Sequence, residues 1–306
     1  MIHITDELED SAIDIAFAIP ALRHVLSWIY PFTKHARIFG NFMNHVRDAM
    51  RSRRSGKGPK GPDLLRIIMD EQMAALKNHL ETASDRERYL DDQDITSNIV
   101  ILLLAGYEAM SSALSFLTYL LAKHPSEQNE ILKEIDQLFP NRGSQQLSYD
   151  ELRKLKRLDM VVKEGLRLYP PVPLTVTRRC TQDTTACGQF IPAGVNVLAS
   201  SWLIHRDPVL WPNPEEFVPE RFAAGSSERY PSGSYVPFGL GPRSCIGREL
   251  GPLIVKSVLI QLLQTCKLSL LDSVASPVRP HSRALTLVPK DGIKIRVERR
   301  LTREAA

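Results

Sequence analysis

The sequence has few cysteines, the residues that form the disulfides of small folds and bind structural metals. Its 306 residues include four cysteines, Cys180, Cys187, Cys245 and Cys266, and no two of them form a C-x-x-C pair. This spacing argues against a structural zinc site and a disulfide framework, so we expect reduced thiols. The formal net charge is only +4, which gives no reason to expect a nucleic acid as partner.

The first residues lack the basic and apolar regions of a signal peptide. A later segment, residues 95–122, is long and apolar and carries a single charge, Glu108. Serine, threonine and asparagine are scattered through it, and a charge at the centre of a bilayer costs about 2.5–3.5 kcal/mol. We therefore predict a helix inside a protein core rather than a membrane span.

Hydrophobic residues make up 43% of the chain, enough to bury a sizeable core. Periodicity predicts helices over 63–80, 94–123, 126–138, 159–168 and 246–265, with Asp94 capping the long central helix. Residues 174–179 and 185–200 are strand-like, 206–244 are coil, and 284–297 form a predicted hairpin. We expect one domain over 1–306, mainly α in 1–170, with the β hairpins, a coil meander and the last helix in 171–306.

Residues 47–60 form a basic stretch, with six Lys and Arg side chains against the single acid Asp48. We interpret this stretch as a solvated loop between helices. Contact with anionic lipid headgroups is the alternative.

The most specific chemistry lies in the cysteine loop, residues 237–247, a glycine-rich segment that leads into the predicted last helix. Its distinctive members are Phe238, Gly239, Gly241, Arg243, Cys245 and Gly247. A helix N-terminus and a nearby arginine favour the thiolate form of cysteine, and a thiolate is a metal ligand. The glycines let a large flat group approach, Phe238 can shield the sulfur from water, and Arg243 offers a cation to a carboxylate. An isolated cysteine would be interpreted as an inert packing residue. The neighbours of Cys245 favour a metal ligand instead.

Three further motifs accompany the cysteine loop: Ala105-Gly106-Tyr107-Glu108, Glu164-Gly165-Leu166-Arg167 and Pro219-Glu220-Arg221-Phe222. Together with Phe238-x-x-Gly241-x-Arg243-x-Cys245-x-Gly247 they resemble, in the same order, the motifs of the cytochrome P450 family. The sequence between these motifs is similar to the sequences of the microsomal branch, which contains drug-oxidising enzymes and thromboxane synthase. The resemblance covers about residues 10–300 and implies that family's α+β fold and haem b as cofactor.

The resemblance also implies roles for the site residues. Cys245 would be the axial thiolate on the haem iron. Arg243 would pair with one haem propionate and Arg178 with another, with Arg179 as the alternative to Arg178. Ala105 would belong to the oxygen-binding groove of the central helix.

Glu108 would deliver protons through water, because an unpaired buried carboxylate is costly without a reason. Its alternative is a carboxylate that lines a wet patch. Glu164 and Arg167 lie three residues apart on one helix face, which by spacing alone indicates an ordinary surface ion pair. The resemblance implies instead a buried structural network that Arg221 joins.

The sequence departs from the family pattern at Ala109, where a hydroxyl that helps protonate bound dioxygen is expected. Ser111 and Ser112 follow, but on a different helix face. A monooxygenase that takes electrons from NADPH through NADPH-cytochrome P450 reductase is the first hypothesis. An isomerase of a lipid endoperoxide, which needs no reductase, is the second, because thromboxane synthase also has apolar residues here.

The third hypothesis is a non-catalytic fragment, because the family's N-terminal membrane anchor, first helices and strands have no counterpart in the sequence. We expect a full-length form on the cytosolic face of the endoplasmic reticulum membrane and a small apolar substrate. Arg248 and Lys256 would face either an acidic redox partner or solvent. His205 is expected to be a hydrogen-bonded loop residue, and the other three cysteines are expected to be packing residues.

Overall fold

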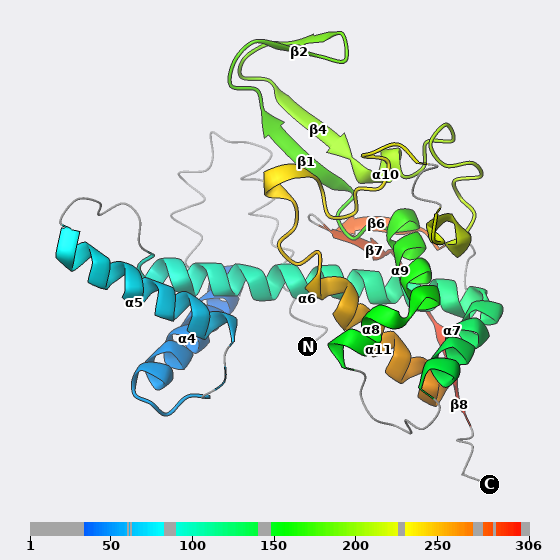
Figure 1. Ribbon diagram of the computed structural model, residues 1–306, viewed down its shortest axis with the longest axis horizontal. Coiled ribbons are helices and arrows are strands. Elements are labelled where there is room, and N and C mark those ends of the chain that lie inside the picture. The colour runs from blue at the N-terminus through cyan, green and yellow to red at the C-terminus, as the bar shows by residue number, and fades with distance from the viewer. Residues whose placement is uncertain are drawn as a thin grey trace. The chain divides into compact units, whose positions relative to one another are not determined.

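The computed structural model describes residues 34–59, 61, 63–82, 90–139, 148–225, 230–271, 278–283 and 286–300 (Figure 1). Its helices are α4 (Lys34–Arg54), α5 (Leu64–Thr82), α6 (Asp92–Lys123), α7 (Pro125–Leu138), α8 (Tyr149–Lys154), α9 (Lys156–Leu168), α10 (Ser201–Ile204) and α11 (Leu250–Thr265), with 3-10 turns η3 (Pro219–Phe222) and η5 (Gly241–Arg243). Its strands are β1 (Leu174–Arg179), β2 (Thr184–Ala186), β3 (Gln189–Ile191), β4 (Asn196–Ser200), β5 (Cys266–Leu270), β6 (Pro280–Arg283), β7 (Thr286–Pro289) and β8 (Ile295–Arg299). This is the predicted class, mainly α with a small β part.

The chain divides into two compact units, Met1–Ala105 and Gly106–Ala306, and the boundary falls inside the continuous helix α6. The prediction of one domain over 1–306 stays a prediction. Apolar residues also recur at roughly helical spacing over 10–50; α4 confirms this for 34–50, and 10–33 lie outside the described residues.

In the first unit, α4, α5 and the first turns of α6 share a small apolar core. Its buried members are Val46, Met50, Leu65, Met69, Ile95, Ile99 and Val100. Arg54 at the end of α4 donates to both carboxylate oxygens of Asp92 at 2.6 and 2.7 Å. These hydrogen bonds lower the pKa of Asp92 to about 2, so the pair ties α4 to the start of α6 at neutral pH.

Two sequence predictions in this unit are wrong. The predicted loop over 47–60 is helical as far as Arg54, because Arg53 and Arg54 have acidic partners in Asp63 and Asp92. The N-terminus of α6 is capped by Asp91 rather than Asp94. The carboxylate of Asp91 accepts from the Asp94 N–H at 2.7 Å, and Asp94 accepts in return from the Asp91 N–H at 3.1 Å.

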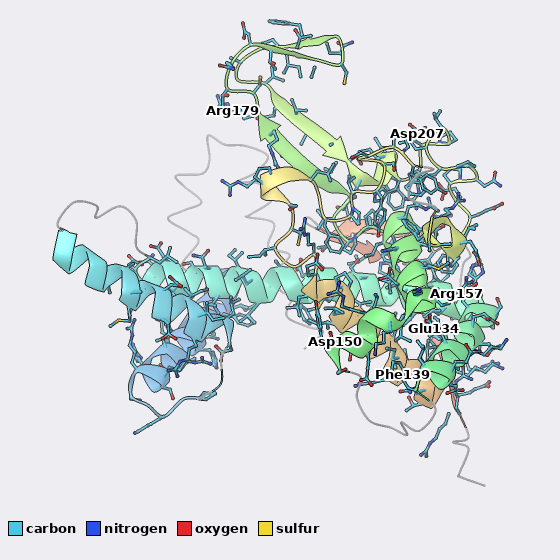
Figure 2. The ribbon with its side chains drawn as sticks, in the orientation of Figure 1. Glu134, Phe139, Asp150, Arg157, Arg179 and Asp207 are labelled. Carbon is cyan, nitrogen blue, oxygen red and sulfur yellow. The ribbon has the colours of Figure 1, made fainter. Side chains whose placement is uncertain are left out.

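The second unit has a main core, to which the last turns of α6, the helices α7, α8, α9 and α11, and strand β5 contribute. A smaller apolar cluster beside it contains Phe116, Tyr119, Leu120, Leu168, Tyr169, Val278 and Leu287. Gly165 lets α9 approach α6 closely, since a Cβ at this position would come within 2.3 Å of Leu117 Cδ2. Ser148 and Glu151 form the predicted capping box at the start of α8. Arg157 begins α9 and joins Glu127 of α7 at 2.6 Å and Glu220 of η3 at 2.8 Å. Figure 2 shows Arg157 and Glu134 where α7 and α9 meet.

Helix α6 is long and apolar enough to cross a membrane by length and composition, and 28% of its most apolar window is buried. Its last turns are buried within the second unit: Phe116, Leu117, Tyr119, Leu120 and Leu121 are each at most 3% exposed. This end of the helix has the protein environment that the sequence predicts.

In the described residues the strands form four two-stranded antiparallel sheets. The predicted strand-like stretches 174–179 and 185–200 are confirmed as strands, and in the structure β1 pairs with β4 and β2 with β3. The predicted hairpin over 284–297 is wrong, because β7 pairs back with β6, and β8 pairs with β5. The turn itself exists: the Gly292 N–H donates to the Pro289 carbonyl at 3.2 Å, and Gly292 has φ +65°. This turn connects β7 in the β6–β7 sheet to β8 in the β5–β8 sheet.

The interaction between Glu164 and Arg167 is fully buried rather than superficial, as the resemblance implies. Both side chains are 0% exposed, and Arg167 donates to the Glu164 carboxylate at 2.7 and 2.9 Å. The remaining N–H groups of Arg167 donate to carbonyls of the coil: His205 at 2.7 Å, Pro214 at 2.8 Å and Glu216 at 3.0 Å. All five guanidinium donors are therefore used.

Glu164 is satisfied from the coil as well. Its carboxylate accepts from the Val218 N–H at 2.9 Å, and Arg221 Nε lies 3.4 Å from it. Together Glu164 and Arg167 hold residues 205–221 against α9.

We expect Arg167→Lys to lower the free energy of unfolding by about 3 kcal/mol or more. A lysine has three donors for five acceptors, and breaking a buried ion pair leaves buried polar groups uncompensated. Urea unfolding followed by circular dichroism measures the loss. Arg153→Lys on exposed α8 is the control and should change stability by less than about 0.5 kcal/mol. Equal stability of the two variants would contradict the role given to Arg167.

Candidate cysteine-centred site

The cysteine loop is a series of tight backbone turns, and Gly239 and Gly241 make them possible. Their φ angles of +70° and +76° lie in the left-handed region that glycine adopts without strain. The Ser244 N–H donates to the Gly241 carbonyl at 3.0 Å, and the Cys245 N–H donates to the Phe238 carbonyl at 2.8 Å. These bonds fix the backbone of Cys245 while its side chain stays exposed.

The sequence predicts that the last helix starts at residue 246, directly after Cys245, and that boundary is wrong. Helix α11 begins at Leu250, five residues after Cys245, and Arg248 donates its N–H to the Cys245 carbonyl at 3.4 Å. The cysteine is therefore presented by a turn. Gly247 lies directly beneath it, since a Cβ there would be 3.8 Å from the sulfur.

The open side of the loop carries the cation. Arg243 ends η5 and is exposed, as are Gly241 and Pro242. A Cβ at Gly241 would meet no atom within 4 Å, so a flat group can approach the backbone there. Phe238 lies on the opposite side, where it packs against the core of the second unit.

His205 connects this loop to the buried ion pair, a role that sequence reasoning missed. The imidazole is 0% exposed; its Nδ1 lies 3.2 Å from the Arg167 carbonyl, and its Nε2 accepts the Val236 N–H at 2.8 Å. Since Nε2 is the acceptor, we assign the ring proton to Nδ1. Burial lowers the pKa of His205 to about 4, so the ring stays neutral at pH 7. Its spacing to Val236 gives no sequence pattern by which to find it.

Glu108 and Ala109 lie on α6, and both are half-buried. The hydroxyl of Thr286 donates to the Glu108 carboxylate at 3.4 Å, and the hydroxyl of Ser112 donates to the Leu287 carbonyl. Glu108 and Ser112 thus face strand β7. Ser112 therefore cannot replace the hydroxyl that is missing at Ala109. Ala105 is an exposed residue of α6 and the last residue of the first unit.

Arg178 and Arg179 are consecutive residues of β1, so their side chains point to opposite faces. The guanidinium of Arg179 lies near the turn at Gly194 (Figure 2). Arg178 is exposed and donates to the Thr177 carbonyl at 3.0 Å. Within the described residues, no hydrogen bond or ion pair joins Glu108 or Arg178 to the cysteine loop.

Two smaller expectations are corrected here. Lys256 does not face solvent: it is 5% exposed and forms an ion pair with Asp159 of α9, which also pairs with Lys163 at 2.7 Å. Cys187 is not a packing residue, because it is exposed and occupies the β2–β3 turn with φ +49°. Arg248 is exposed as expected.

Comparisons with known proteins match this arrangement to one family. The family model described as Cytochrome P450 matches residues 1–297. The chain is 36% identical over 248 residues to cytochrome P450 3A27 of Oncorhynchus mykiss, which covers 81% of this chain and 46% of that protein. It is 34% identical over 284 residues to cytochrome P450 3A12 of Canis lupus familiaris, covering 93% of this chain and 54% of that protein. It is 36% identical over 228 residues to cytochrome P450 3A7 of Homo sapiens, covering 74% of this chain and 43% of that protein.

This chain belongs to the cytochrome P450 family, whose cofactor is a thiolate-ligated haem. It spans about half the length of the curated relatives that it matches.

The residues of the cysteine loop fit a haem. Among the described residues no cluster of three or more His, Cys, Asp or Glu could hold a metal ion. The iron of a haem is already held by the flat ring and needs a ligand from the protein, which a single exposed cysteine can supply. Arg243 is placed to meet an acidic substituent of that group, and open space at Gly241 leaves room for its face.

We expect stability to fall as the pH falls from about 6.5 to about 4. Unfolded His205 takes up a proton near pH 6.5, but native His205 resists protonation until about pH 4, so this loss reaches about 3 kcal/mol below pH 4. Urea unfolding of the wild type and His205→Gln between pH 4 and 7.5 tests this. Because other groups titrate in both proteins, the difference between the two curves isolates His205. A difference that does not vary with pH would contradict the assignment.

Proposed function

We propose that this chain carries the haem-thiolate site of a cytochrome P450 monooxygenase, which inserts one oxygen atom of O2 into a small apolar substrate. The observation that carries the proposal is Cys245, a thiol held exposed by a backbone hydrogen bond to Phe238. Membership of the family and the similarity to the 3A proteins support it.

In this proposal the loop residues divide the work of holding the haem. Cys245 would hold the haem iron through its thiolate, and Arg243 and Arg178 would pair with the propionates. The loop has no side chains at Gly239, Gly241 and Gly247, so the flat haem ring can lie close to its backbone. A thiolate-bound haem supplies the capacity to activate dioxygen and cleave its O–O bond.

The remaining residues act around the reacting centre. Phe238 packs against the core of the second unit and, in this proposal, would shield the sulfur from water once the haem covers its exposed face. Glu108 accepts a hydrogen bond from Thr286, so its carboxylate is oriented and can relay protons through water. Ala105 contributes a small side chain to the oxygen-binding groove.

The proposal includes a redox partner and a location. Electrons would come from NADPH through NADPH-cytochrome P450 reductase, and exposed Arg248, three residues after the cysteine, offers such a partner a cation. The full-length protein would be associated with the endoplasmic reticulum membrane on its cytosolic face. Lys256 is not part of this docking surface, because it is buried against Asp159.

A specific observation supports a second candidate, an isomerase of a lipid endoperoxide. Ala109 lacks the hydroxyl that would help to protonate dioxygen, and the nearby Ser112 hydroxyl is bonded to Leu287. An isomerase needs neither that hydroxyl nor a reductase. A fragment that does not hold haem is the remaining alternative.

Reconstitution with haemin tests the cofactor site directly. The purified 306-residue chain, reduced and exposed to CO, should show the red-shifted Soret band of thiolate-ligated haem. Cys245→Ser should lose this band, because a hydroxyl does not replace the thiolate, whereas Cys187→Ser on the exposed β2–β3 turn should keep it. A Cys245→Ser chain with an unchanged band would overturn the assignment, and a wild-type chain without haem would favour the fragment.

Turnover separates the monooxygenase from the isomerase. With NADPH and reductase, Ala109→Thr should raise the product formed per NADPH consumed by about tenfold or more, because a positioned proton donor typically contributes at least that much. Ala109→Val adds similar bulk without a hydroxyl and should not. Turnover of an endoperoxide without NADPH, unaffected by either substitution, would identify the isomerase instead.

A further inference from the structure

A groove with a volume of about 700 Å³ lies beside the cysteine loop, and Cys245 is not among the residues that line it. It is formed by α8, α9, the first turns of α11 and the residues Phe222, Ala224, Tyr235 and Phe238. This volume falls in the range of small-molecule sites, roughly 300–1,000 Å³. The residues assigned to proton delivery and to the propionates do not line it, whereas Phe238 and Arg248 do.

The rim of the groove is strongly basic. Five cationic side chains line it, Arg153, Lys156, Lys163, Arg248 and Lys256, against only two carboxylates, Asp159 and Glu249. The groove therefore has an excess of three positive charges in a chain whose total net charge is +4.

The two carboxylates do not neutralise the cations at one end of the groove. Asp159 is engaged by Lys163 and Lys256, and Glu249 lies 3.7 Å from Arg248. Arg153 and Lys156 remain, both exposed on neighbouring turns of α8 and α9. Arg153 is fixed by the Tyr149 ring, to whose hydroxyl it donates at 3.2 Å. In the described residues, Lys156 forms no ion pair.

The floor of the groove is apolar. Met160, Leu166, Phe222, Phe238 and Leu253 line it. Leu166 belongs to the core of the second unit, and Phe238 and Leu253 pack against that core, so the floor is rigid. A free anion such as phosphate would use the rim and leave this apolar surface in water.

We propose that the groove binds an anionic amphiphile, a molecule with one carboxylate or phosphate on a single alkyl chain. The anion lies between Arg153 and Lys156, and the chain covers the floor toward Phe238 and Leu253. Charged hydrogen bonds orient the head, and burial of the chain adds affinity in proportion to its apolar area. A fatty acid and a lysophospholipid share this chemistry.

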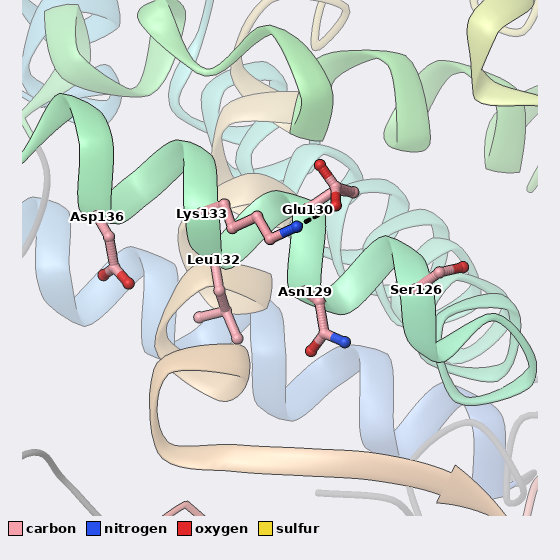
Figure 3. Close-up of a pocket in the computed structure, with 6 residues that line it drawn as sticks. All are labelled: Ser126, Asn129, Glu130, Leu132, Lys133 and Asp136. Atoms are coloured by element: carbon pink, nitrogen blue, oxygen red, sulfur yellow. Dashed lines mark hydrogen bonds and ion pairs between the residues drawn. The ribbon is translucent and has the colours of Figure 1, made fainter.

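A second groove in the described part of the second unit lies on α7 and lacks these features. Figure 3 shows it, lined by Ser126, Asn129, Glu130, Leu132, Lys133 and Asp136, with a volume of about 370 Å³. Its one cation, Lys133, is paired with Glu130 at 2.8 Å, and Asp136 adds a further negative charge. An anion has no free cation there, and an alkyl chain has a single leucine.

Isothermal titration calorimetry of the 306-residue chain with decanoate, decyl phosphate and 1-decanol tests the proposal. At least one of the two anions should bind, and 1-decanol should bind about tenfold or more weakly, because it lacks the charge that meets Arg153 and Lys156. Whichever anion binds more tightly identifies the preferred head, carboxylate or phosphate. Acetate and inorganic phosphate should show no comparable binding.

Charge reversals locate the site. Arg153→Glu and Lys156→Glu should each weaken the better anion about tenfold, whereas Lys154→Glu, an exposed neighbour on α8 that does not line the groove, should leave it unchanged. Circular dichroism checks that the surface variants fold. Equal binding of 1-decanol, equal binding of the short anions, or equal weakening by Lys154→Glu would each overturn the proposal. The titration is made with and without haemin, so failure of the haem site does not decide it.

Discussion

The buried ion pair between Glu164 and Arg167 is the interaction on which the second unit depends. Burying two charges is costly, and the cost is offset only when every donor and acceptor finds a partner. Here all five N–H groups of Arg167 are used, three of them by the carbonyls of His205, Pro214 and Glu216. Those carbonyls belong to coil that has no ladder of its own to satisfy them. The pair therefore gives an irregular segment one defined course.

The same pair reaches the cysteine through a short chain of hydrogen bonds. The Arg167 carbonyl holds the His205 ring, the ring accepts the Val236 N–H, and the Phe238 carbonyl accepts the Cys245 N–H. Burial keeps His205 neutral, so its Nε2 remains an acceptor at pH 7. A loop of glycines has little stiffness of its own, and this chain supplies it. Cys245 can then be exposed and still have a fixed position.

The sequence predicts most of the helices, because periodicity is a local property. The spacing of Glu164 and Arg167 indicates only a surface ion pair, and the buried network that Arg221 joins is implied by the resemblance to the family. Prediction from sequence fails where partners are distant. The hairpin over 284–297 is wrong because β7 and β8 each pair with a strand earlier in the chain. The basic stretch is helical because Arg54 finds Asp92, 38 residues away. In the sequence His205 looks like any loop histidine, because its partner Val236 is 31 residues away. Lys256 looks like a surface lysine, because its partner Asp159 is 97 residues away.

Native-state hydrogen exchange tests most directly whether the buried pair governs the cysteine loop. The account predicts that the amides of Val236 and Cys245 exchange with nearly the same opening free energy as the amides of α9, because loop and helix open as one unit. Loop amides that exchange freely while those of α9 stay protected would contradict it. The cysteine would then be held by local turns alone, and Glu164 and Arg167 would stabilise α9 and the coil without positioning Cys245.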